Sequence, residues 1–234
     1  MAPPEGNPKS SGLSVRAVSA AVLAPVVLWV VHAGTPFFEI LVIAAAAIMA
    51  YEWNRLCSGL TGGRSGGRAV WLASGVVYIG LPCLALLFLR ATPEFGRETL
   101  FWLLAIVWAA DTGAYAFGRL IGGPKLAPVI SPNKTWAGLT GGIGLAALAG
   151  VGAALFLEKP DVLVLAGWSA LIGAVSQGGD LVESWVKRHF KVKDTGSIIP
   201  GHGGMLDRVD GLLAAALAVA IINAAGQGSL LTWT

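Results

Sequence analysis

Charge is concentrated in one stretch of an otherwise apolar chain, residues 179–210, which reads GDLVESWVKRHFKVKDTGSIIPGHGGMLDRVD. Asp180 and Glu183 are three residues apart, as are Asp207 and Asp210, so each pair would share one face of a helix. Paired carboxylates suit a hard divalent cation such as Mg²⁺, which proteins commonly hold with one or two of them together with substrate phosphates. The stretch therefore contains candidate ligands for a metal–polyphosphate complex.

The segment between the two acidic pairs contains groups that bind phosphate. Its basic residues are Lys187, Arg188, Lys191 and Lys193. Lysine and arginine side chains pair with phosphate oxygens. A Gly/Pro loop carrying His202, Gly203 and Gly204 follows, and glycines allow backbone N–H groups to approach an anion closely. The alternative interpretation is a charged loop that joins two membrane helices and has no catalytic role.

The order of these residues resembles the signature of the phosphatidate cytidylyltransferases (CDP-diacylglycerol synthases). The matching segments are Ser184-x-x-Lys187-Arg188, Lys193-Asp194, Pro200-x-His202-Gly203-Gly204 and Asp207-Arg208-x-Asp210. More than ten fixed positions agree over 27 residues, with unusual spacings. A match of this kind is far more specific than a single glycine motif.

A second region extends the same resemblance. The family's D-x-x-A-Y-x-x-G segment is matched by Asp111, Ala114, Tyr115 and Gly118. Its S-P-x-K-T-x-E-G segment is matched by Ser131, Pro132, Lys134, Thr135 and Gly138, with Ala137 in place of the usual acid. We expect Ser131–Thr135 to open a helix, whose free N–H groups would favour phosphate, although Ser or Thr there is also an ordinary N-cap. The resemblance covers about residues 100–212.

The composition predicts the elements that must position these residues. The 234 residues are 55% hydrophobic and 12% charged, with a mean hydropathy of +0.71, which excludes an ordinary soluble domain. We predict an all-α, polytopic integral membrane protein with about seven transmembrane helices and a polar pocket that faces the cytoplasm. No soluble basic fold remains to bind nucleic acid. Cys57 and Cys83 have no metal-ligand spacing and are expected to be buried thiols.

Seven apolar runs are long enough to span a bilayer, about residues 15–33, 37–54, 70–89, 99–118, 136–157, 162–185 and 208–226. The polar, Pro- and Ser-rich residues 1–14 before them are predicted to form a mobile tail. Residues 15–98 are then N-terminal transmembrane helices, and residues 99–234 a catalytic transmembrane core. With the N-terminus inside, 13 of the 16 Lys and Arg residues fall on the cytoplasmic side, as the positive-inside rule expects.

The acidic residues of the fourth, sixth and seventh predicted spans lie at similar depth. Asp111 is about two-thirds of the way along span four toward its cytoplasmic end. A carboxylate at the bilayer centre costs about 2.5–3.5 kcal/mol on insertion scales, so it normally faces a polar cavity or a partner. An aspartate near a helix end can also simply be hydrated. Successive spans alternate in direction, which brings three groups of acids to the same depth in the membrane: Asp111, the acids of 180–183 and those of 207–210. This common depth predicts a single water-filled pocket.

The resemblance implies a reaction and roles for these residues: CTP and phosphatidate would give CDP-diacylglycerol and pyrophosphate, with Mg²⁺ as cofactor and a second cation left open. Asp180 and Asp207 match the family's metal-binding acids, and Asp210 and Asp111 are further candidates near the metal. The expected phosphate contacts are Lys187, Arg188, Lys193 and Arg208. His202 would contact phosphate or transfer a proton, and Lys134 would contact the nucleotide. The remaining candidates around the substrates are Tyr115, Ser131, Thr135, Ser184, Asp194, Gly203 and Gly204. The family also implies a homodimer.

Three other functions are compatible with a multi-span protein that carries such acids. A CDP-alcohol phosphotransferase would carry a D-G-x-x-A-R motif, which this sequence lacks. A CTP-dependent polyprenol or phytol kinase would transfer phosphate rather than cytidylate. A transporter would also place acids near the membrane midplane, but it would release no pyrophosphate from CTP and phosphatidate.

Overall fold

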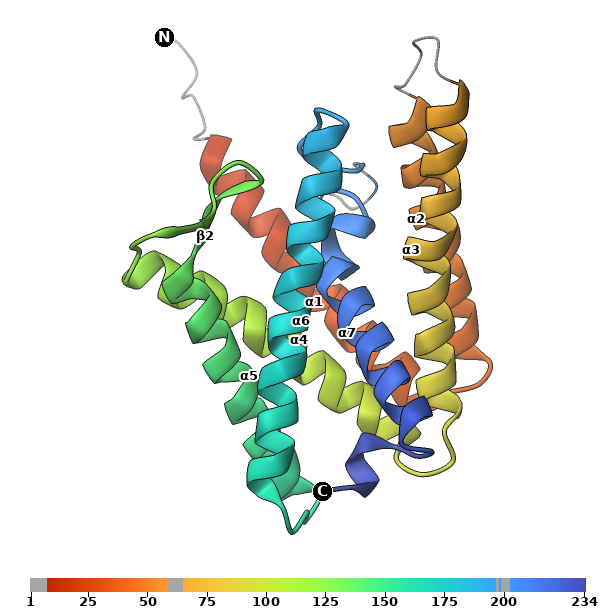
Figure 1. The fold of residues 1–234 in the computed structure, drawn as a ribbon, viewed down its shortest axis with the longest axis vertical. Helices are drawn as coiled ribbons and strands as arrows, with labels where there is room; N and C mark the ends of the chain where they lie inside the picture. The colour runs from red at the N-terminus through yellow and green to blue at the C-terminus, as the bar shows by residue number, and fades with distance from the viewer. Residues whose placement is uncertain (1–7, 59–64, 197, 199–202) are drawn as a thin grey trace, which may run out of the picture.

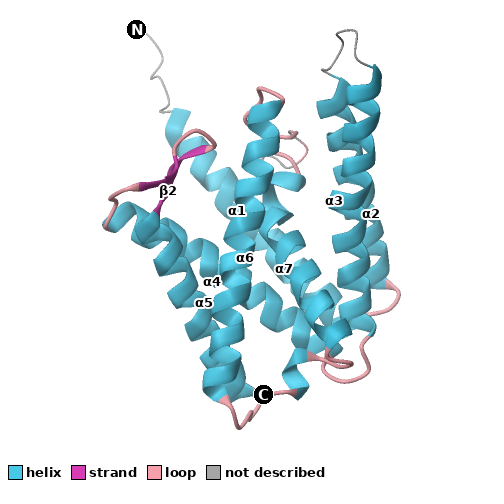
Figure 2. Cartoon of the chain, viewed as in Figure 1, coloured by secondary structure: helices cyan, strands magenta, loops and turns pink. Residues whose placement is uncertain are grey.

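The computed structural model describes residues 8–58, 65–196, 198 and 203–234. Within these residues the chain forms seven long helices: α1 (Pro8–Ala33), α2 (Phe37–Ser58), α3 (Ser65–Ala91), α4 (Gly96–Leu120), α5 (Trp136–Phe156), α6 (Val162–His189) and α7 (Leu206–Ala225). A short hairpin of β1 (Lys125–Ala127) and β2 (Ser131–Thr135) joins α4 to α5, and the 3₁₀ helix η1 (Leu230–Thr232) lies near the C-terminus. Helices dominate the structure (Figure 2), so the predicted all-α class is confirmed apart from this hairpin.

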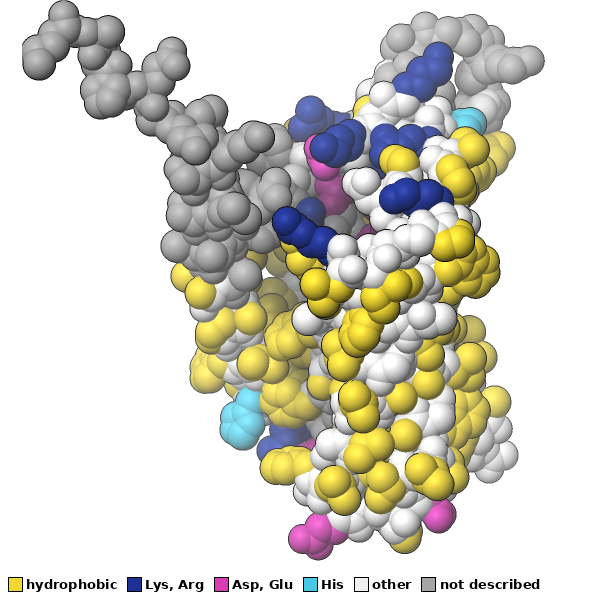
Figure 3. Space-filling view, turned by 90° about the vertical axis from the view of Figure 1, so that its left-hand side faces the viewer, with side chains coloured by type: hydrophobic (Ala, Val, Ile, Leu, Met, Phe, Trp, Pro, Cys, Tyr) yellow, Lys and Arg dark blue, Asp and Glu magenta, His cyan; other side chains and the backbone are white. Residues whose placement is uncertain are grey.

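The seven helices correspond one to one with the seven predicted spans. In the described part of the chain, six of them, α2 to α7, are long and apolar enough to cross a membrane, while the described apolar part of α1 is the shorter Ala21–Ala33. Large apolar side chains such as Val76, Leu148 and Leu163 are exposed on the helix surfaces, as expected for contact with lipid. Figure 3 shows hydrophobic side chains over most of the lower part of one face, with Lys and Arg gathered at its upper end.

The helices pack as a bundle in which α4 crosses obliquely (Figure 1). The closest neighbours are α4 with α5, α5 with α6 and α6 with α7, while α2 pairs with α3, which also packs on α7. A side chain at Gly142 of α5 would lie 2.7 Å from the carbonyl oxygen of Ala110 in α4. Small residues allow this close approach between membrane helices. The contact fixes α5 and the preceding strand β2 against the helix that carries Asp111.

Two boundaries differ from those predicted. Helix α1 begins at Pro8, and proline is favoured at a first helical position. The helix therefore overlaps the predicted tail over residues 8–14. Residues 1–7 of that tail lie outside the described chain. Residues Ser131–Thr135 form a strand rather than the first turn of α5, because proline disfavours the helical conformation of the residue before it. Thr135 acts as the N-cap of α5, since its Oγ1 accepts from the backbone N–H of Gly138 at 3.0 Å.

Candidate functional site

A polar cavity of about 470 Å³ opens among α4, the β1–β2 hairpin, α6 and α7. Gly138 and Leu139 of α5 and Asp194 also line it, so its walls come from two parts of the chain, residues 111–139 and 177–210. Ten of the predicted site residues line it: Asp111, Tyr115, Lys134, Thr135, Asp180, Lys187, Asp194, Asp207, Arg208 and Asp210. The single pocket expected from the depth of the acids is thus present among the described residues.

Asp180 and Asp210, which line this cavity, form a cluster of carboxylates with the buried Glu183. One oxygen of each lies within 4.8 Å of the others, and Oε1 of the buried Glu183 has no hydrogen-bond partner among the described residues. Three oxygens that converge from α6 and α7 fit a hard divalent cation. Oε2 of Glu183 pairs with Lys187. A buried polar atom without a partner is costly, so a bound cation would satisfy the remaining oxygen of this carboxylate.

Lys134 connects the hairpin to this cluster. Its Nζ lies 2.7 Å from Oδ2 of Asp180 and 3.1 Å from Oε1 of Gln177. The side-chain amide of Gln177 donates to Oδ1 of Asp111 at 2.8 Å. A continuous polar network therefore joins β2, α6 and α4 at the cavity wall. Gln177 was missed in the sequence analysis, although its place three residues before Asp180 puts it on the same helical face.

Asp207 has a different environment from the other acids. Its side chain is 2% exposed, and Oδ1 lies 3.0 Å from Nζ of Lys187. Oδ2 accepts from the backbone N–H groups of Thr195 at 3.0 Å and Gly204 at 2.9 Å. Lys187 also lies 2.5 Å from Oε2 of Glu183. The structure therefore groups Asp180 with Glu183 and Asp210, while Asp207 reaches back to the segment before its own helix as in a capping box. The predicted metal pair of Asp180 and Asp207, which line the same cavity, stays a prediction.

The two glycines before α7 are explained by this geometry. Gly203 has a φ of +87°, a left-handed conformation that glycine adopts without strain. A Cβ at Gly203 would also lie 2.9 Å from Oδ2 of Asp207. These glycines therefore shape the loop around a carboxylate of the chain itself, and their predicted contact with substrate stays a prediction.

Several predicted residues lie outside the cavity lining. Ser184 is buried and its hydroxyl donates to Oδ1 of Asp180 at 3.3 Å, so it supports a lining residue instead. Arg188 donates to the carbonyls of Ile130 and Val192 at 3.2 and 3.1 Å, which ties the hairpin to the end of α6. Lys193 is exposed, and Ser131 and Gly204 are not part of the lining. His202 lies outside the described residues.

Comparisons with known proteins show which family the chain is similar to. A family model described as "Cytidylyltransferase family" matches residues 62–225. A protein of Brucella suis biovar 1 (strain 1330) named "Phosphatidate cytidylyltransferase" is 38% identical over 254 residues, which cover 92% of this chain and 94% of that protein. A protein of Staphylococcus aureus (strain COL) with the same name is 41% identical over 146 residues, or 62% of this chain and 55% of that protein. The matched residues 62–225 contain every residue that lines the cavity.

Proposed function

Because this chain belongs to the cytidylyltransferase family, we propose that the cavity among α4, α6 and α7 is the place where it transfers the cytidylyl group of CTP to phosphatidate. The chain is a nucleotidyltransferase of CDP-diacylglycerol synthesis. The observation that carries the assignment of the site is that Asp180 and Asp210 line one cavity beside Lys134 and converge there with the buried Glu183. The three carboxylates can bind a divalent metal ion, and the ammonium group of Lys134 can bind phosphate oxygens.

In the proposed mechanism, a phosphate oxygen of phosphatidate attacks the α-phosphorus of CTP. A new P–O bond forms, the bond from the α-phosphorus to the oxygen that bridges it to the β-phosphate breaks, and pyrophosphate leaves with that electron pair. The attacking oxygen is already ionised near neutral pH, so no strong base is needed. The main barrier is the repulsion between two polyanions, which cationic groups reduce.

The residues of the cavity suit this task of charge neutralisation. We propose that Asp180, Glu183 and Asp210 hold Mg²⁺, which supplies stabilisation of charge on phosphate oxygens when it is bound. Lys134 and Arg208 line the same cavity and would contact phosphate oxygens. Lys187 is paired with Glu183 and Asp207, so its role is to hold these two carboxylates in place. The ion pair of Lys134 with Asp180 would loosen when a nucleotide phosphate approaches.

An isotope experiment tests this function against the alternative kinase reaction. The purified protein in detergent, with phosphatidate and Mg²⁺, is expected to place label from [α-³²P]CTP in the lipid and label from [γ-³²P]CTP in pyrophosphate. Omission of phosphatidate, of CTP or of Mg²⁺ should each reduce the release of pyrophosphate to background. Transfer of the γ-label to a lipid, or release without phosphatidate, would contradict the proposal.

We further propose that the protein resides in the cytoplasmic membrane with the cavity open to the cytoplasm. The support is the distribution of Lys and Arg in the sequence and the gathering of these residues at the upper end of the molecule (Figure 3). The homodimer implied by the family resemblance remains a prediction, which the mass of the detergent-solubilised protein, corrected for bound detergent, would test.

Cysteine labelling tests this orientation. In a background without Cys57 and Cys83, a cysteine is introduced at the exposed Lys191 after α6 or at the exposed Glu158 at the other end of the bundle. A membrane-impermeant maleimide should label Lys191→Cys in inside-out vesicles only, and Glu158→Cys in right-side-out vesicles only. The reverse pattern would place the cavity on the outer side.

A further inference from the structure

We propose that Glu52 of α2 is a positioning residue for the site, because it holds the N-terminus of α7 and thereby fixes where Asp207 and Asp210 lie. This inference rests on the proposed function. Glu52 lies before the residues that the family model matches, in a helix for which the sequence analysis found no motif. Its side chain is completely buried, although carboxylates are almost never fully buried unless they are paired.

The carboxylate of Glu52 caps helix α7 from a different helix. Oε1 accepts from the backbone N–H of Met205 at 2.9 Å, and Oε2 from that of Leu206 at 3.0 Å. The first N–H groups of a helix have no partner within the helix, and Met205 makes no side-chain cap at this terminus. A carboxylate there gains charge-assisted hydrogen bonds and a favourable interaction with the helix dipole. Glu52 thus does for α7 what a local Ser, Thr or Asp does elsewhere.

Glu52 and Asp207 hold the same two segments of backbone. The hydroxyl of Thr195 donates to Oε2 of Glu52 at 3.4 Å, while the backbone N–H of Thr195 donates to Asp207. The N–H of Gly204 donates to Asp207, and the next two N–H groups donate to Glu52. The two carboxylates therefore fix the segment at residue 195 and the start of α7 relative to each other.

Two glycines pack closely against the carboxylate of Glu52. A Cβ at Gly204 would lie 2.7 Å from Oε1 of Glu52, and one at Gly196 would lie 2.6 Å from the same atom. The next residue, Trp53, anchors α2 to α3, because its ring N–H donates to the carbonyl of Trp71 at 2.7 Å. Helix α2 thus provides a rigid support, and a change at Glu52 should be transmitted to the acids of α7.

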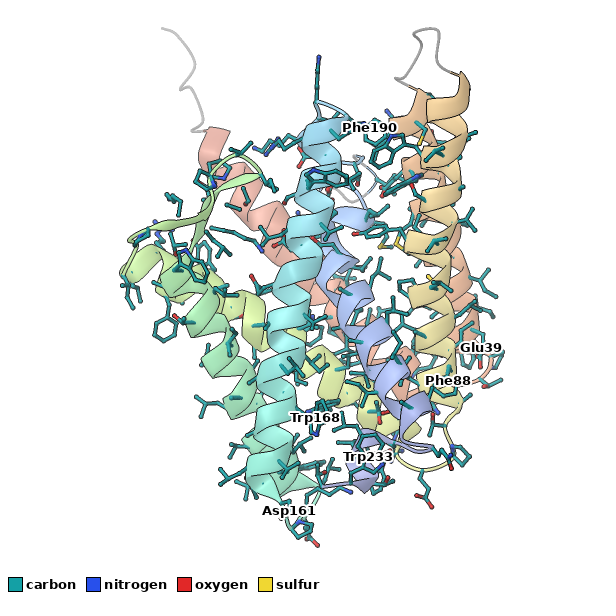
Figure 4. The ribbon with its side chains drawn as sticks, in the orientation of Figure 1. Glu39, Phe88, Asp161, Trp168, Phe190 and Trp233 are labelled. Atoms are coloured by element: carbon teal, nitrogen blue, oxygen red, sulfur yellow. The ribbon has the colours of Figure 1, made fainter. Side chains whose placement is uncertain are left out.

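The test is the substitution Glu52→Gln, with Glu39→Gln as its matched control. An amide keeps one acceptor oxygen but turns an NH₂ group toward a backbone N–H donor, so one cap hydrogen bond is lost. We expect kcat to fall about 10- to 100-fold, as for residues that orient metal ligands, and the Mg²⁺ concentration for half-maximal rate to rise. Glu39 lies at the opposite end of α2, where it accepts a hydrogen bond from the hydroxyl of Thr35. It is far from Phe190, which follows the last residue of α6 (Figure 4). Glu39→Gln should therefore leave kcat and the Mg²⁺ requirement within twofold of the wild type.

Three outcomes decide the proposal. If Glu52→Gln lowers only the thermal midpoint, while kcat and the Mg²⁺ requirement match the wild type below that midpoint, Glu52 is structural and the proposal is overturned. If Glu52→Gln does not fold, Thr195→Val removes one donor to Glu52 and should shift the Mg²⁺ requirement in the same direction; an unchanged requirement overturns the proposal. If the wild type itself shows no CTP-dependent turnover, the proposed function fails. If the wild type is active and Glu52→Gln is equally active, only the role of Glu52 fails.

Discussion

The substitution Asp180→Asn is expected to reduce cytidylyl transfer at least about a hundredfold, in the range seen when a group that stabilises transition-state charge is removed. Asp180 is the one acid that belongs to the carboxylate cluster and also pairs with Lys134, at 2.7 Å. An amide removes the negative charge from both interactions while keeping the shape of the side chain. Pyrophosphate release at saturating CTP and phosphatidate, measured at matched amounts of folded protein, gives the effect.

The control for this substitution is Asp161→Asn. Asp161 precedes the first residue of the same helix and is exposed at the far end of the bundle (Figure 4). Its neutralisation should leave turnover unchanged, since it lies outside the cavity lining. Wild-type turnover in Asp180→Asn would remove Asp180 from the site, and with it the placement of the metal in the carboxylate cluster.

The arrangement of spans could be predicted from the sequence because the bilayer imposes a simple rule. Every backbone polar group must be satisfied inside lipid, so long apolar runs have to be helices. The alternation of direction then places acids such as Asp111, Asp180 and Asp210 at one end, where the structure finds them around one cavity. Only length, hydropathy and charge were needed for this step, and none of these depends on detailed packing.

The pairing of the acids could not be predicted, because it depends on side-chain direction at helix ends. The sequence spacing puts Asp207 and Asp210 on the same face of one helix, so it does not distinguish their roles. Asp207, however, lies in the first turn of α7 and accepts from the backbone N–H groups of Thr195 and Gly204. Similarly, Glu52 is 153 residues away from Met205 in sequence, and no local pattern indicates that α2 will cap α7. The hairpin was missed because Ser131–Thr135 also reads as an N-cap segment.

The substitution Asp207→Asn is expected to reduce turnover strongly, for a different reason from Asp180→Asn. An amide in place of the carboxylate would lose the ion pair with Lys187 and turn an NH₂ group toward the N–H of Thr195 or Gly204. A buried donor left without an acceptor costs about 1–3 kcal/mol. Because Asp207 holds Lys187 and the start of α7, we expect kcat to fall about a hundredfold, the upper end of the range for residues that orient metal ligands, together with a lower thermal midpoint.

Metal binding separates the two roles, because a ligand that binds only the folded protein raises its thermal midpoint. Addition of Mg²⁺ with CTP should raise the midpoint of the wild type and of Asp207→Asn, but not that of Asp180→Asn. The resemblance to the cytidylyltransferase signature implies instead that Asp207 is itself a metal ligand, in which case both variants would lose the shift. A shift that persists in Asp207→Asn would assign this carboxylate to the N-terminus of α7 and leave the cation to Asp180, Glu183 and Asp210. Loss of the shift in both would mean that Asp207 turns from Lys187 toward the metal when substrate binds.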